Sequence, residues 1–156
     1  MVQQYDAAPG MKARLNGPED ILSLPFSGAG VANDGDVVII NTDGKSVSNV
    51  TDATNKKYGV IIRHGVGKSG KNSVGKEAYQ ATDMVPTMTI GSLWVKATTP
   101  VTDITANVYV KTANGTTDAP LGSLSPSATD GTQLPNASWE TISNAQGLAV
   151  VRLRGA

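Results

Sequence analysis

The chain has 156 residues, thirteen basic and thirteen acidic side chains, one His and no Cys. The lack of Cys excludes disulfides, thiolate nucleophiles and Cys-ligated zinc, and a single His excludes a multi-His metal site. The balanced charge disfavours a general nucleic-acid binder, and no apolar run approaches the ~20 residues that span a membrane. The first residues have neither a basic start nor an apolar stretch, so we expect no secretory signal.

Size and composition predict one domain of β structure. Val, Ile and Thr make up a quarter of the chain, and these β-branched residues fit a pleated sheet better than a helix. Seventeen Gly and eight Pro divide the sequence into short segments. We therefore expect an all-β fold, either a β-sandwich of jelly-roll type or a small barrel. An extended N-terminal arm over residues 1–20 would precede a single β domain over residues 21–156.

The arm is predicted because residues 1–20 lack hydrophobic periodicity and contain Pro9-Gly10 and Gly17-Pro18. A disordered tail is the alternative interpretation. Within the domain, the continuous apolar run Val37–Ile40 predicts a strand that is either buried on both faces or edge-on in a sandwich. Asp43-Gly44 is typical of a hairpin turn. A second buried strand is expected at residues 60–62, followed by a Gly-rich flexible loop at residues 65–76.

The second half of the chain contains further short strands. Residues 84–90 predict a strand interrupted at Pro86, which favours an edge position. Residues 116–135 are rich in Gly, Pro, Ser and Thr and predict a long loop. The other strands are expected at residues 93–97, 108–111, 139–142 and 148–153.

Charge is unevenly distributed along the chain. Residues 56–76 carry six basic side chains and no acid, whereas residues 1–55 and 77–151 each have an excess of four acids. The basic stretch is either a solvated loop or a patch that docks on an acidic surface. Docking of that kind raises the association rate more than the affinity.

No motif indicates catalysis or a cofactor. Gly67-Lys68-Ser69 resembles the end of a phosphate-binding loop, but Ile62 stands where the first Gly is required and no helix follows. His64 is interpreted as a structural or surface residue. Asp34 and Asp36 lack the spacing of a calcium loop and favour a turn. We therefore expect a protein that is not an enzyme and binds no cofactor or metal.

Three aromatic residues leave an alternative function open. Trp94, Tyr109 and Trp139 would form a sugar-stacking platform if they were exposed together. The protein would then be a carbohydrate-binding or adhesin-like β-sandwich module. Packing of these rings in the core is the competing interpretation.

Four segments occur in an order typical of one family. They are Ala8-Pro9-Gly10 with Arg14 and Gly17, the run YGVIIRH at residues 58–64, the MVP and GSLWV motifs within residues 84–95, and VYV followed by Asn114-Gly115. This order resembles that of tailed-phage capsid cement proteins, also called decoration proteins. The resemblance covers residues 10–112 and resumes at 147–154. The segment 105–107 lacks the Gly that usually precedes VYV, and residues 116–140 have no counterpart.

The resemblance implies a small β-sandwich protein that binds the outside of the expanded phage capsid and cements neighbouring major capsid proteins. The implied partners are the major capsid protein and further copies of the chain, with a homotrimer favoured over a dimer. The implied location is the outer surface of the virion, after synthesis in the host cytoplasm. No nucleic acid, membrane or catalytic step is implied.

Seven residues are candidate contacts in this interpretation. The arm would reach across the capsid or a neighbouring subunit, and the basic loop 65–76 would meet acidic capsid loops. The loop 116–135 would face solvent or a neighbouring copy. The candidate contact residues are Tyr5, Pro9, Lys12 and Arg14 in the arm, and Lys68, Lys71 and Lys76 in the loop.

Overall fold

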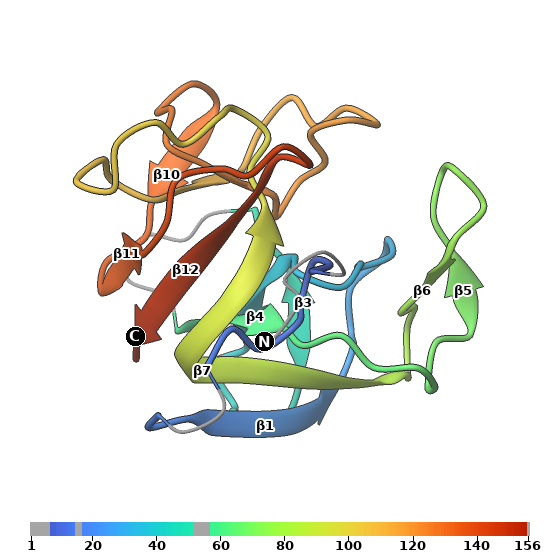
Figure 1. Ribbon diagram of the computed structural model, residues 1–156. Coiled ribbons are helices and arrows are strands. Elements are labelled where there is room, and N and C mark those ends of the chain that lie inside the picture. Colours follow the sequence, from blue (N-terminus) through green and yellow to red (C-terminus); the bar gives the residue numbers. More distant parts are fainter. Residues whose placement is uncertain (1–6, 15–16, 52–56, 156) are drawn as a thin grey trace.

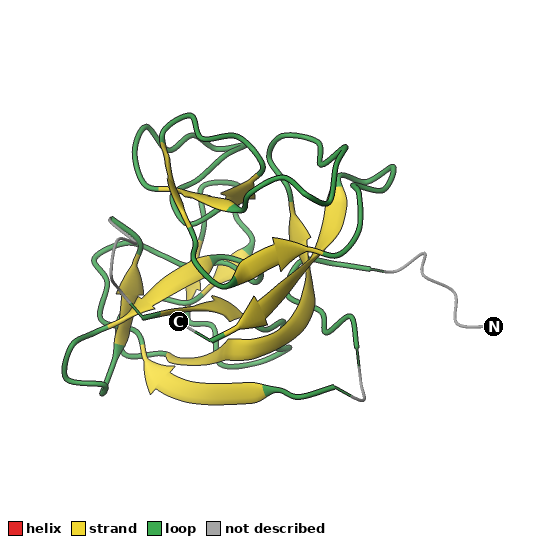
Figure 2. Cartoon of the chain, turned by 90° about the vertical axis from the view of Figure 1, so that its left-hand side faces the viewer, coloured by secondary structure: helices red, strands yellow, loops and turns green. Residues whose placement is uncertain are grey.

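The computed structural model describes residues 7–14, 17–51 and 57–155, and within them it contains strands and loops but no helix (Figure 1, Figure 2). The predicted all-β class is therefore confirmed. The strands are β1 (Asp20–Pro25), β2 (Val37–Ile40), β3 (Val47–Asn49), β4 (Tyr58–Ile61), β5 (Gly70–Lys71), β6 (Glu77–Ala78), β7 (Met84–Lys96), β8 (Tyr109–Lys111), β9 (Leu124–Ser125), β10 (Gly131–Gln133), β11 (Ala137–Trp139) and β12 (Leu148–Arg154).

The strands form three antiparallel sheets. The largest has seven strands in the order β11-β12-β7-β4-β2-β3, with β1 paired to β7. A second sheet has the order β10-β8-β9, and β5 and β6 form a separate hairpin. No sheet formed by the described residues closes into a barrel, so the architecture is the sandwich-like alternative of the two expected ones. Figure 1 shows the β5–β6 hairpin standing away from the body of the molecule.

The main core lies between the seven-stranded sheet and the β10-β8-β9 sheet. Alternate residues of each strand point into it, as the period of two in a strand requires. In β12, for example, Ala149, Val151 and Leu153 are buried in this core, as the sequence pattern predicts. The other strands contribute Val37, Ile39, Val60, Leu93, Val95, Val110 and Leu124, and Val108 joins them from just before β8.

A second apolar cluster lies on the opposite face of β2 and β4. It contains Phe26, Val38, Ile61 and Tyr79, each almost fully buried. The strand β2 is thus buried on both faces, which explains why its sequence is apolar without alternation. The sequence prediction for Val37–Ile40 is confirmed in its bounds and its burial.

The strand β7 is the centre of the large sheet and corrects one prediction. It joins the two strands expected at residues 84–90 and 93–97 into one of thirteen residues, paired with β1, β4 and β12. Pro86 is therefore not on an edge strand. Its carbonyl accepts a bond from the Ile62 N–H at 2.9 Å, just beyond the end of β4. The N–H and C=O of a residue face the same neighbour in an antiparallel ladder. The N–H that Pro86 lacks would therefore face Ile62, where the strand β4 has already ended.

The two predicted loops contain regular structure. The segment 65–76 is not a featureless loop, because it includes β5, which pairs with β6. The segment 116–135 includes β9 and β10, which flank β8. The strand expected at residues 139–142 begins earlier, as β11 at Ala137–Trp139. Strands of two or three residues are too short to produce a recognisable alternation in sequence.

The described part of the predicted arm lies against the domain. The N–H of Gly10 donates to the Trp94 carbonyl at 2.7 Å, and the N–H of Ala13 donates to the Ser92 carbonyl at 2.9 Å. Gly10 has a positive φ of 82°, and a Cβ on it would lie 2.7 Å from the Arg63 nitrogen. Only glycine fits this backbone contact. Residues 10–13 thus bond to the second half of β7.

Candidate functional site

The described residues contain no group of three or more His, Cys, Asp or Glu side chains that would hold a metal ion. They also include no helix long and apolar enough to cross a membrane.

The candidate residues of the arm differ in their surroundings. Tyr5 lies outside the described residues. Pro9 is half-buried, and its ring packs against the turn at Gly35. A Cβ added to Gly35 would lie only 2.9 Å from the Cβ of Pro9. The Lys12 amine forms an ion pair with Glu19 at 2.9 Å. Arg14 has a side chain 61% exposed, which leaves it accessible to a partner.

Lys68 is the candidate contact whose environment is least suited to docking. Its amine lies 2.9 Å from the Asp34 carboxylate, and its side chain is only 10% exposed. The same amine donates to the His64 carbonyl at 2.6 Å and lies 5.4 Å from the centre of the Tyr79 ring. Lys68 therefore fastens the base of the β5–β6 hairpin to the domain rather than presenting its charge to solvent.

Further hydrogen bonds hold the same base. The Asp83 carboxylate accepts bonds from the Ser69 N–H at 2.9 Å and the Ser69 hydroxyl at 2.7 Å, and from the Gln80 N–H at 2.9 Å. Partial burial opposes its ionisation, but these bonds outweigh that effect and hold the Asp83 pKa below its usual value. The Asn72 amide donates to Asn33 at 2.8 Å. The hairpin is thus fixed at both of its strands.

Two exposed lysines of the segment 65–76 lie on the hairpin beyond its base. Lys71 and Lys76 are exposed, and they flank Val74, which is 60% exposed. Val66, at the start of the same segment, is 68% exposed. The structure therefore separates the three candidate lysines into one anchor and two exposed cations beside an apolar side chain.

The turn that precedes β2 contains the most perturbed carboxyl group. Burial raises the pKa of Asp36 from its ordinary value of 3.8 to about 6, against the opposing effect of hydrogen bonds from Asn33. The Asn33 N–H donates to the Asp36 carboxylate at 3.0 Å, and the Asn33 amide donates to it at 3.2 Å. The negative charge of Asp34 raises the pKa further. The turn interpretation of Asp34 and Asp36 agrees with this geometry.

The aromatic residues do not form a platform. Trp139 is 3% exposed and belongs to the main core, where its indole N–H donates to the Asn107 carbonyl at 3.3 Å. Trp94 is half-buried on β7, and Tyr109 is half-buried on β8 in the other sheet. The rings thus lack the joint exposure that sugar stacking requires.

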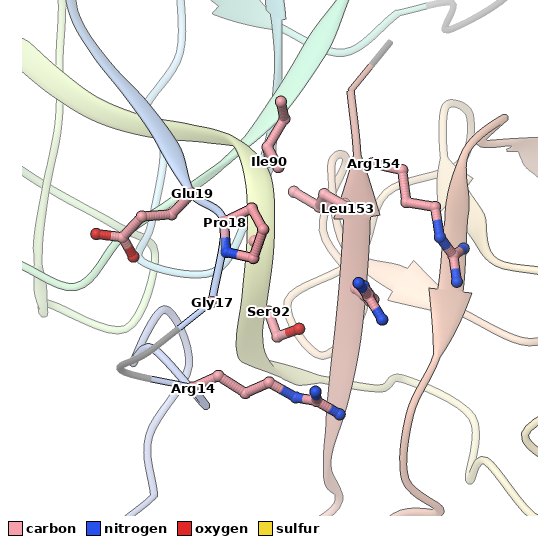
Figure 3. A pocket seen from close by; sticks show the side chains of 10 residues that line it. Arg14, Gly17, Pro18, Glu19, Ile90, Ser92, Leu153 and Arg154 are labelled. Carbon is pink, nitrogen blue, oxygen red and sulfur yellow. The ribbon is translucent and has the colours of Figure 1, made fainter.

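A pocket of about 200 Å³ lies between the N-terminal segment and β12, across the middle of β7. Figure 3 shows the Arg14 side chain reaching from that segment toward β12, where Arg152 and Arg154 are found. We call it the arginine pocket. Its other walls are formed by Gly17, Pro18, Glu19, Ile90, Gly91, Ser92 and Leu153.

Sequence reasoning predicted Arg14 as a contact but not the arginine pocket. Arg14 and Arg154 are 140 positions apart in the numbering, and only the pairing of β12 with β7 brings them to one place. The alternation of β12 did place Arg152 and Arg154 on one face, which is the single signal in the sequence that indicates a basic surface there.

The described residues form an all-β, sandwich-like fold. The family model described as structural cement protein (E217 gp24/Pam3 gp6) matches residues 2–154. The chain belongs to this phage structural cement protein family and has a capsid-stabilising structural role.

A solved structure gives the same fold. A chain of the structure described as "The capsid of Myoviridae Phage XM1" is 14% identical, with a TM-score of 0.69. The similarity covers 100% of this chain and 96% of that chain. Among curated proteins, none matches this sequence.

Proposed function

We propose that the protein binds the outer surface of the expanded capsid and cements neighbouring major capsid proteins. It acts in many copies and by contact alone, without catalysis, and it contacts neither nucleic acid nor membrane. It is made in the host cytoplasm and resides on the virion. Family membership supports the capsid as the partner.

The observation that carries the proposal is the β5–β6 hairpin. It stands away from the body of the molecule, and its base is fixed by the Lys68–Asp34 ion pair and by Asp83 (Figure 1). A projecting element that is already ordered loses little conformational freedom on docking. Its exposed cations, Lys71 and Lys76, suit an acidic capsid surface, and Val74 adds an apolar contact.

Co-sedimentation with shells of the cognate phage tests the function. We expect saturable binding to expanded shells at a fixed ratio to the major capsid protein, and little binding to unexpanded shells. Repeated weak contacts on one shell combine into stable attachment. Failure to bind either form of the shell would contradict the proposal.

A further inference from the structure

The arginine pocket has the chemistry of an anion site. Arg14 and Arg152 share the carboxylate of Glu140, at 3.2 and 3.8 Å, while Glu140 is only 14% exposed. The Arg154 guanidinium donates to the Ser138 hydroxyl at 3.0 Å. These contacts do not use all of the N–H donors of the three side chains, since each guanidinium carries five.

The charges of the arginine pocket do not cancel. Glu140 is shared by two of the arginines, and Glu19, the acid in the lining, is already paired with Lys12. Among the lining residues and these ion-pair partners, two positive charges remain in excess. A guanidinium binds a carboxylate through two parallel N–H donors, so the surplus favours a planar anionic group.

The arginine pocket is also partly apolar. Pro18 and Ile90 lie on its walls (Figure 3). Figure 3 shows the Glu19 side chain pointing away from β12, so it does not cross the opening toward that strand. An apolar wall beside cationic groups fits a peptide that carries an acid next to an aliphatic side chain. A small inorganic anion would leave these carbon atoms uncovered.

We propose that the arginine pocket binds an acidic peptide segment of the major capsid protein through an Asp or Glu carboxylate. This inference rests on the proposed function and adds to it a second docking site. The pocket lies between Arg14, Gly17, Pro18 and Glu19 on one side and β12 on the other, so a bound capsid segment would also hold these four residues against the sheet.

Charge-neutral variants test the arginine pocket. The double variant Arg14→Gln/Arg154→Gln removes two guanidinium groups and leaves Arg152 to pair with Glu140. The matched control Lys45→Gln/Lys57→Gln removes the same charge from exposed positions elsewhere. On expanded shells we expect the first variant to bind at least about tenfold more weakly than wild type, with a smaller salt dependence, and the control to bind like wild type.

A cross-linking experiment identifies the occupant. Benzoylphenylalanine in place of the exposed Pro18 would be photoactivated on expanded shells, with the same substitution at the exposed Thr42 as the control. We expect the Pro18 position to give one main capsid-protein peptide that contains Asp or Glu next to an aliphatic residue. A cross-linked peptide without an acid would overturn the inference.

The two proposals fail in different ways. If wild-type protein binds neither form of the shell, the cement function itself is contradicted. If the wild type binds and the Arg14→Gln/Arg154→Gln variant binds equally well, the function stands and the arginine pocket is not a docking site. If the variant and the wild type unfold at the same temperature, any loss of binding does not come from misfolding.

Discussion

Lys68 illustrates how a charged side chain serves the fold instead of a partner. Its amine neutralises Asp34 at a site where little water reaches either group. The second Asp34 carboxylate oxygen and the Tyr79 hydroxyl are buried and have no hydrogen-bond partner among the described residues. The lysine is therefore the main compensation for a partly buried negative charge.

Replacing this lysine tests its role. We expect Lys68→Ala to lower the free energy of unfolding by about 1–3 kcal/mol, because it leaves the partly buried Asp34 charge without its partner. The matched variant Lys71→Ala, at an exposed position of the same hairpin, should change it by less than about 0.5 kcal/mol. Urea denaturation measures both. Equal effects of the two substitutions would contradict the anchoring role. The double variant Lys68→Met/Asp34→Asn should recover part of the unfolding free energy that Lys68→Ala loses.

The raised pKa of Asp36 makes stability depend on pH. The folded-state pKa, about 6, lies above the value expected in the unfolded chain, so folding favours the protonated carboxyl. The contribution to stability is present below the unfolded-state value and is lost as the pH rises through about 6. At pH 8 the charged form costs on the order of 3 kcal/mol.

The variant Asp36→Asn isolates this contribution. We expect it to be more stable than wild type at pH 8, because the amide carries no charge and still accepts a bond from Asn33. The difference should disappear as the pH falls from 7 to 4. Asp83 has a lowered pKa and acts in the opposite direction, but it is common to both proteins and cancels in the difference. A difference in unfolding free energy that stays constant with pH would contradict the assignment.

At the scale of elements, the segment 8–13 is bonded to the domain along the second half of β7. Four backbone hydrogen bonds join it to the domain, through Gly10, Met11 and Ala13. A deletion that includes this segment removes bonds that stabilise the fold as well as any contact with the capsid. A test of the arm must therefore remove less of the chain.

Two truncations separate the roles. Deleting residues 1–6 removes none of these four bonds, so we expect unchanged stability and reduced occupancy of expanded shells. Deleting residues 1–13 should lower the free energy of unfolding by about 2–4 kcal/mol, since the net value of a hydrogen bond is about 1 kcal/mol. Denaturation and co-sedimentation measure the two effects. Full occupancy after the shorter deletion would remove the first six residues, and Tyr5 with them, from the mechanism.

The β5–β6 hairpin can be tested without disturbing its base. The variant Lys71→Glu/Lys76→Glu reverses two exposed charges, and Lys45→Glu/Lys57→Glu reverses two exposed charges elsewhere. We expect the hairpin variant to associate with expanded shells more slowly, most strongly at low salt, where screening is weakest. Association of both variants at the same rate would exclude the two hairpin lysines from docking.

The elements that sequence predicted well are those with long apolar patterns. Val37–Ile40 and the strand at residues 148–153 were predictable because burial on one or both faces leaves a direct pattern in the side chains. The Pro86 edge prediction was wrong because the pattern does not show where a neighbouring strand ends. The inward position of Lys68 and the assembly of the arginine pocket depend on pairing between distant segments, which no local pattern contains.

At the scale of the whole molecule, the number of copies that act together remains to be measured. We propose a homotrimer, with a dimer as the alternative, because a closed ring gives each copy equivalent contacts. Sedimentation equilibrium of the free protein and the binding ratio on shells measure this number. A monomer in solution that binds shells without cooperativity would contradict a preformed ring.

The length of β7 has a mechanical consequence for a protein attached at two places. Met84 lies at the end of β7 next to the hairpin base, and Ser92 lies in the wall of the arginine pocket. If the hairpin and the pocket hold different capsid subunits, tension between those subunits runs along this strand. Ladder bonds in an antiparallel sheet are perpendicular to the strands, so such tension loads many of them in shear at once. The strand β7 would then resist extension until several of its backbone hydrogen bonds break together.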